Sequence, residues 1–97
     1  MPEHSRIVRI TTFVPADGRH DDLVSACEQI ATTLRRTDGC FGAQICTVAE
    51  EPTLITAISR WRDQDALDTY GSAAGGPQIP AELLGAQPVT RHHLALS

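Results

Sequence analysis

The sequence lacks the features that mark membrane, secreted and nucleic-acid-binding proteins. No apolar run approaches the ~18 residues of a membrane span, and the N-terminus has no apolar core of the kind found in signal peptides. The net charge is −4, and the longest run of basic residues is Arg35-Arg36, so the basic stripe that nucleic acid requires is missing. We therefore expect a cytoplasmic protein that binds neither membranes nor nucleic acids.

Cysteine is scarce, and its spacing does not indicate a disulfide framework. The three cysteines, Cys27, Cys40 and Cys46, form no C-x-x-C motif. Cys40 and Cys46 are six positions apart on one expected strand, which is too far for a bridge within that strand. We predict that all three are reduced and pack as small hydrophobic residues. A nucleophilic role would need a histidine at bonding distance, which a sequence cannot show.

A chain of 97 residues, 41% of them hydrophobic, is the size of one domain, and we assign residues 1–97 to a single unit. Period-two and helical patterns predict the order strand, helix, strand, strand, helix, strand. The expected strands are residues 6–14, 40–49, 54–61 and 88–96, and the expected helices are residues 19–37, a helix capped by Asp63 and a short segment at 80–84. Residues 1–5 are expected to fray, and residues 71–77 are expected to form a loop. This order is typical of a ferredoxin-like α+β fold, with four antiparallel strands and both helices on one face.

The first three expected strands carry apolar residues on both faces. In the first strand, for example, Ile7 and Phe13 lie on one face, and Val8 and Ile10 lie on the other. Two helices cover only one face, and an open antiparallel sheet should be polar on the other. We therefore expect a homodimer that pairs through its sheet faces.

Residues 54–70 join a strand to the second main helix and contain the only tryptophan and the only tyrosine, Trp61 and Tyr70. Both aromatic rings should lie near the point where strand and helix diverge, where they could wall a pocket. The alternative for Trp61 is a place in the core, and the alternative for Tyr70 is a ring packed on the sheet with its hydroxyl in water.

Several motifs together resemble the antibiotic biosynthesis monooxygenase domain family, whose members form dimeric α/β barrels. They are the opening strand RIVRITTFV, the Pro-x-x-Gly turn that follows it, the run DGCFG at residues 38–42, and SRWRD at residues 59–63 followed by Ala66-Leu67. The resemblance covers residues 6 to about 96. It implies a pocket between sheet and helices in each subunit.

Some members of this family oxidise aromatic polyketides or quinols with dioxygen, without metal or flavin, and others bind and degrade haem. By resemblance, Trp61 matches a pocket tryptophan of the polyketide-oxidising members. Their asparagine, tyrosine and arginine fall at Ala57, near Leu67 and near Leu84. The haem-degrading members use an asparagine and a tryptophan where this chain has Thr11 and Tyr70. They also use a later histidine, and none occurs at residues 71–84.

We therefore predict a cofactor-independent monooxygenase acting on a small aromatic polyketide or quinol-like molecule, with no metal and no cofactor. A non-catalytic ligand-binding or accessory protein of the same fold is the alternative, and haem degradation ranks below both. Trp61 and Tyr70 are the candidate catalytic residues, and Arg9, Arg91 and Phe13 are the candidate substrate-binding residues. A mid-strand arginine such as Arg9 or Arg91 requires an anion, which could instead be a carboxylate across a dimer interface.

Three other features have two readings each. His92 and His93 point to opposite faces of one strand, so they cannot chelate one metal ion together, and a surface or interface role is favoured over catalysis. His20 opens a helix and is expected to be solvent-exposed. Gly75-Gly76 could hinge a lid over the pocket or belong to a plain loop.

Overall fold

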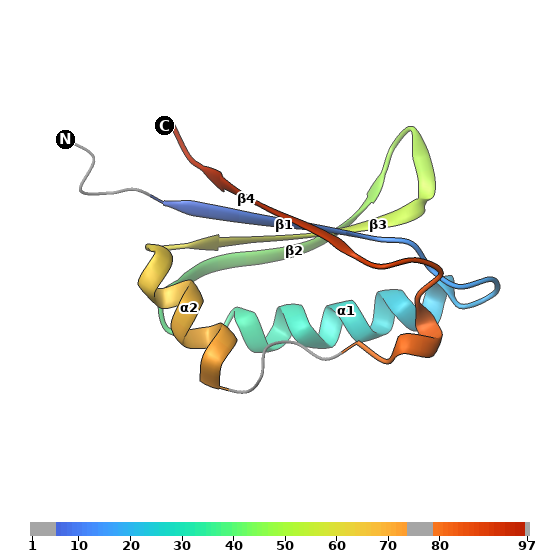
Figure 1. Ribbon diagram of the computed structural model, residues 1–97, viewed down its shortest axis with the longest axis horizontal. Helices are drawn as coiled ribbons and strands as arrows, with labels where there is room; N and C mark the ends of the chain where they lie inside the picture. The colour runs from blue at the N-terminus through green and yellow to red at the C-terminus, as the bar shows by residue number, and fades with distance from the viewer. Residues whose placement is uncertain (1–5, 74–78, 97) are drawn as a thin grey trace.

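The computed structural model describes residues 6–73 and 79–96 and has the predicted order of elements. The four strands form one antiparallel sheet in the order β2-β3-β1-β4, and α1 and α2 lie on the same side of it (Figure 1). The ferredoxin-like α+β fold is thereby confirmed. The bounds are β1 Ile7–Phe13, α1 His20–Leu34, β2 Cys40–Val48, β3 Glu51–Trp61, α2 Gln64–Ala73, the 3-10 turn η1 Ala81–Leu83 and β4 Val89–Leu94.

Helix α1 runs beneath the sheet and buries the predicted apolar stripe. Leu23, Cys27 and Leu34 are buried, as is Ala31. These positions recur every three or four residues, so they share the helix face that meets the sheet. The helix ends at Leu34, three residues earlier than the sequence pattern indicated.

Two local predictions about β3 and α2 need correction. Strand β3 begins at Glu51 instead of residue 54, so it contains Pro52. Proline fits there because β1 pairs with β3 only from Ile55 onward, so the missing N–H faces no partner on that side. Helix α2 extends to Ala73, so the loop expected from residue 71 begins no earlier than residue 74.

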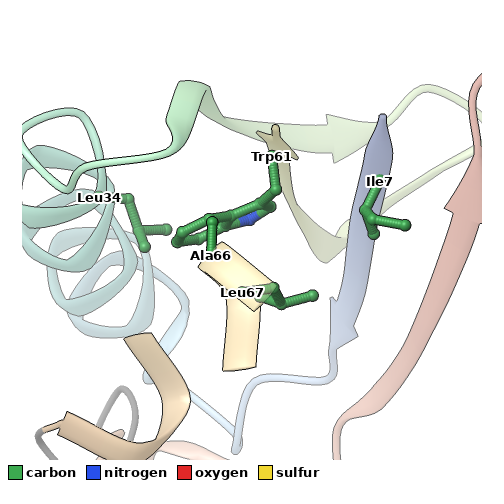
Figure 2. Packing of buried hydrophobic residues seen from close by; sticks show 5 residues of the cluster. All are labelled: Ile7, Leu34, Trp61, Ala66 and Leu67. Atoms are coloured by element: carbon green, nitrogen blue, oxygen red, sulfur yellow. The ribbon is translucent and has the colours of Figure 1, made fainter. Parts of the chain in front are cut away.

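The buried residues form two clusters between sheet and helices. One cluster, shown in Figure 2, consists of Ile7, Leu34, Trp61, Ala66 and Leu67. The other consists of Phe13, Leu23, Cys27, Ile55 and Leu83. In Figure 2 the ring of Trp61 lies between Leu34 of α1 and the α2 residues Ala66 and Leu67. The cluster around Trp61 therefore packs both helices against the end of β3.

The turn η1 is held against the end of β1. The amide of Ala16 donates to the carbonyl of Leu83 at 2.8 Å, and the amide of Gly85 donates to the carbonyl of Val14 at 2.7 Å. A side chain at Gly85 would press on the carbonyl oxygen of Pro15, so glycine permits this close approach. These contacts place Leu83 and Leu84 beneath the sheet.

The second face of the sheet carries no helix in Figure 1. Val8, Ile10 and Ile58, which lie on that face by their register, are only partly buried. Among the described residues, no helix is long and apolar enough to cross a membrane.

Candidate functional site

A cavity of about 290 Å³ lies between the inner face of the sheet and α1. Its walls are mostly apolar and draw on both buried clusters, with Phe13 and Cys27 from one and Leu34 from the other. A volume of this size matches the lower end of small-molecule sites. Ile79, Leu84 and Pro88 line it from the segment that precedes β4.

The polar residues of the lining are Gln44 of β2 and a group of four from neighbouring strands: Arg9, Thr11, Ser59 and Thr90. Arg9 lies opposite Ser59 in the pairing of β1 with β3, and Thr11 lies opposite Thr90 in the pairing of β1 with β4. Because paired residues of an antiparallel sheet share a face, all four side chains lie on the side covered by the helices.

Arg9 is half-buried, and no carboxylate lies within ion-pair distance of it among the described residues. Burial lowers the pKa of its guanidinium, and the proximity of Tyr70 opposes this by raising it. Burial also raises the pKa of the Tyr70 phenol, and the charge of Arg9 partly offsets that rise. An arginine cation thus lies beside a protonated phenol, and an oxyanion would complement this pair.

Ser59 is 4% exposed, and its Oγ accepts a hydrogen bond of 2.8 Å from Nε1 of Trp61. In the next row of the sheet, Oγ1 of Thr11 and Oγ1 of Thr90 lie 2.9 Å apart and share a hydrogen bond. These bonds fix the side chains of both polar rows before any ligand enters.

Cys27 is the only other titratable residue among the described residues of the cavity wall. Burial raises the pKa of its thiol to about 11, and the neighbouring carboxylate of Glu28 adds to the rise. The thiol is therefore protonated at neutral pH and is a poor nucleophile. Cys40 and Cys46 are also free thiols, as the sequence indicated.

The structure places the predicted site residues in three environments. Arg9 and Phe13 line the cavity together. Trp61 is 1% exposed in the core and donates its indole N–H to Ser59, so it does not wall the cavity as the sequence had led us to expect. The ring of Tyr70 packs at a tilt against that of Trp61, and Tyr70 lines a second groove between α1 and α2.

Arg91 lies opposite Ile10 in the register of β4, on the face of the sheet away from Arg9 and the cavity. The structure therefore does not bring the two arginines together. His92 lies opposite Arg9 and His93 opposite Val8, so their side chains do point to opposite faces. Within residues 6–73 and 79–96, no three His, Cys, Asp or Glu side chains come close enough to hold a metal ion.

The polar residues of the lining that sequence patterns did not single out are Gln44, Ser59 and Thr90. Ser59 was visible only as part of the motif before Trp61, and Thr90 only as one residue of an alternating strand. Ala57 and Leu84, where the family resemblance placed polar groups, both line the cavity. The Gly75-Gly76 hinge considered from the sequence lies outside the described residues.

The chain is thus a ferredoxin-like domain with a cavity between its sheet and α1. The sequence profile of the family described as antibiotic biosynthesis monooxygenase matches residues 6–74. The chain belongs to this family. Among curated proteins, none matches the sequence.

Solved structures support the same fold. Rv0793 from Mycobacterium tuberculosis is 23% identical with a TM-score of 0.80, and the match covers 96% of this chain and 97% of that chain. A candidate antibiotic biosynthesis monooxygenase from Nitrosomonas europaea is 12% identical with a TM-score of 0.85, covering 99% and 95% of the two chains. PA3566 from Pseudomonas aeruginosa is 19% identical with a TM-score of 0.82, covering 96% of each. At these identities the likeness concerns the fold alone.

Proposed function

We propose that this protein is a cofactor-independent monooxygenase that oxidises a small aromatic molecule of the quinol or polyketide type. The observation that carries the proposal is the guanidinium of Arg9, which lines a largely apolar cavity without a carboxylate partner among the described residues. A half-buried cation of this kind favours the ionised form of a phenol or enol bound beside it.

The chemistry requires an electron-rich anion and dioxygen. Arg9 lowers the pKa of the bound phenol or enol, so the substrate gives up its proton at neutral pH and its ring carbon becomes a stronger electron donor. Dioxygen accepts four electrons in total. One oxygen atom forms a new bond to the ring carbon, and the other leaves as water with the two hydrogen atoms that the substrate loses.

The apolar walls keep water away from the anion and hold the ring in one orientation. Phe13 lies on the same strand face as Arg9 and offers an aromatic surface in the cavity. In this proposal the indole N–H of Trp61 holds the Ser59 hydroxyl in place, and the nearby phenol of Tyr70 favours the charged form of Arg9. Arg91 would contribute only from the other face of the sheet.

We further propose that two copies pair through the faces of their sheets that no helix covers. Exposed apolar side chains support this pairing, since Phe41 is 57% exposed and Val89 is 56% exposed. Light scattering at micromolar concentration should report a dimer, and a monomer would contradict the pairing.

Oxygen uptake tests the activity. Anthrone and 1,4-naphthohydroquinone are supplied to the purified protein, and dioxygen consumption is followed with an electrode. Arg9→Gln should lower kcat/KM by about 100-fold because it removes the charge that stabilises the anion. Arg36→Gln, an exposed arginine beyond α1, is the matched control and should leave kcat/KM unchanged. Equal rates for Arg9→Gln and the parent would contradict the role of Arg9.

A non-catalytic ligand-binding protein is the second candidate. It is supported by the absence of a side-chain base among the described residues of the cavity wall, where Arg9 and the protonated Cys27 are the titratable groups. Tight binding of the same aromatic molecules without any oxygen uptake would favour this candidate.

A further inference from the structure

The hydroxyl of Ser59 has a proton that its known hydrogen bond does not use. A serine hydroxyl donates one hydrogen bond and accepts others. The indole N–H of Trp61 occupies the accepting side at 2.8 Å, and the residue lines the cavity. Ser59 can therefore donate its proton to a ligand oxygen while Trp61 holds the side chain in place.

Ser59 and Arg9 form one polar row because they are directly paired between β3 and β1. The Cβ atoms of such pairs lie about 4.5–5.5 Å apart. From this starting separation, the long Arg9 side chain can bring its guanidinium to the same ligand oxygen that the Ser59 hydroxyl bonds. Arg9 and Ser59 together can therefore bind an anion, with one charged and one neutral hydrogen-bond donor.

Thr11 and Thr90 form a second polar row. Their hydroxyls share one hydrogen bond of 2.9 Å, which uses one of the two hydroxyl protons. The other proton remains available to a ligand that enters the cavity, which both residues line. This row has no charged group, so it suits a neutral carbonyl or hydroxyl oxygen.

The two rows are separated by the distance from one residue to the next on the same face of a strand. Arg9 and Thr11 are two positions apart on β1, which corresponds to roughly 6.6 Å along the strand. Apolar side chains such as Phe13 and Ala57 flank this span in the cavity. A planar ring with an oxygen at each end would meet both rows at once.

We propose that the cavity selects aromatic ligands with oxygens at opposite ends of a ring, one bound as an anion by Arg9 and Ser59 and the other bound by Thr11 and Thr90. The ligand class is then a para-quinol or hydroxyquinone instead of an aromatic with a single oxygen. This inference rests on the proposed function for placing an aromatic molecule in the cavity. It concerns binding and does not require turnover.

Titration calorimetry with three stable probes tests the two-point recognition. 2-Hydroxy-1,4-naphthoquinone carries an anionic oxygen and an oxygen across the ring. 2,3-Dimethyl-1,4-naphthoquinone carries the two opposite oxygens without charge and has both thiol-reactive ring positions blocked, which matters because the protein has free cysteines. 1-Naphthol carries one oxygen. The parent protein should bind the first at least about tenfold more tightly than 1-naphthol.

The variants separate the two rows. Ser59→Ala should weaken 2-hydroxy-1,4-naphthoquinone about tenfold, since it removes a donor to a charged oxygen. Thr11→Val should weaken both quinones about fivefold and leave 1-naphthol unchanged. Thr47→Val, an exposed threonine on β2, is the matched control and should change none of the three.

The opposing reading is that Ser59 only satisfies the indole N–H and that the threonines only join β4 to β1. Equal affinities of the parent for the three probes, or equal losses for all three in Thr11→Val, would overturn the proposal. If Ser59→Ala does not fold, the probe series and Thr11→Val decide it.

The two proposals fail separately. Selective binding of the quinones without oxygen uptake would keep the two-point site and reject the oxygenase. Oxygen uptake with no preference among the three probes would keep the oxygenase and reject the two-point site.

Discussion

The rings of Trp61 and Tyr70 lie 5.4 Å apart between centroids and are tilted by 38°. Offset and tilted arrangements at this distance are favourable for aromatic pairs. Trp61 ends β3 and Tyr70 belongs to α2, so the contact fastens the helix to the sheet. It also orients the phenol near Arg9, whose charge partly offsets the rise that burial causes in the pKa of Tyr70.

Tyr70 should stabilise the fold through its ring and not through its hydroxyl. Tyr70→Phe keeps the stacked pair, so its free energy of unfolding should stay within about 0.5 kcal/mol of the parent. Tyr70→Ala removes the ring and should cost about 1–2 kcal/mol. Urea denaturation measures both. Equal losses in the two variants would show that the hydroxyl carries the effect.

Trp61 should contribute both to stability and, through Ser59, to binding. Trp61→Ala should cost ~3–5 kcal/mol because it empties a fully buried site, and Trp61→Phe should cost less. If the two variants fold, both should bind 2-hydroxy-1,4-naphthoquinone more weakly, by about tenfold, because neither keeps the indole N–H that holds the Ser59 hydroxyl. An unchanged affinity in folded Trp61→Ala would show that Trp61 does not contribute to ligand binding.

Cys27 should make stability decline at alkaline pH. The thiol ionises near pH 9.0 in the unfolded chain and near 11 in the folded one. Stability should therefore be fully present below pH 9 and fall as the pH rises toward 11, by on the order of 2–3 kcal/mol. Cys27→Ala should flatten this part of the profile. Alkylation of the native protein at pH 8 should modify Cys27 more slowly than Cys46, and equal rates would contradict its burial.

Asp63 should cap α2, as the sequence predicted. Its Oδ1 accepts a hydrogen bond of 2.9 Å from the amide of Ala66, and this bond lowers the pKa of the carboxyl, with Arg62 adding to the effect. The cap should stabilise the helix above the ordinary pKa of aspartate and be lost as the pH falls through the lowered value. Asp63→Ala should lower Tm more than Asp63→Asn at pH 7, because asparagine also caps helices. Calorimetry that finds equal Tm values would contradict the cap.

Gly39 and Gly18 provide a matched pair of substitutions. Both have positive φ, 85° at Gly39 and 73° at Gly18, so alanine is strained at either position. Only at Gly39 would the new Cβ collide with the Cβ of Ala66. Gly18→Ala should cost about 1 kcal/mol, and Gly39→Ala should cost more than that. Chemical denaturation compares them, and equal losses would mean that Ala66 moves aside without cost.

Local patterns in the sequence determined the order of elements, the fold class and the capping residue of α2. The stripe of Leu23, Cys27 and Leu34 identified α1 because helical periodicity is a property of neighbouring residues. Asp63 identified the start of α2 for the same reason, since a cap bonds to an amide three residues away. The family resemblance supplied the expectation of a pocket on the helix side.

Only the tertiary structure decided which side chains line that pocket. The register between β1 and β4 put Arg91 on the opposite face from Arg9, and a shift of one residue would have reversed this. The packing of α1 and α2 around Trp61 buries its ring in the core, where its indole N–H donates a hydrogen bond to Ser59. Burial and register depend on residues far apart in the chain, so the pattern of neighbours could not reveal them.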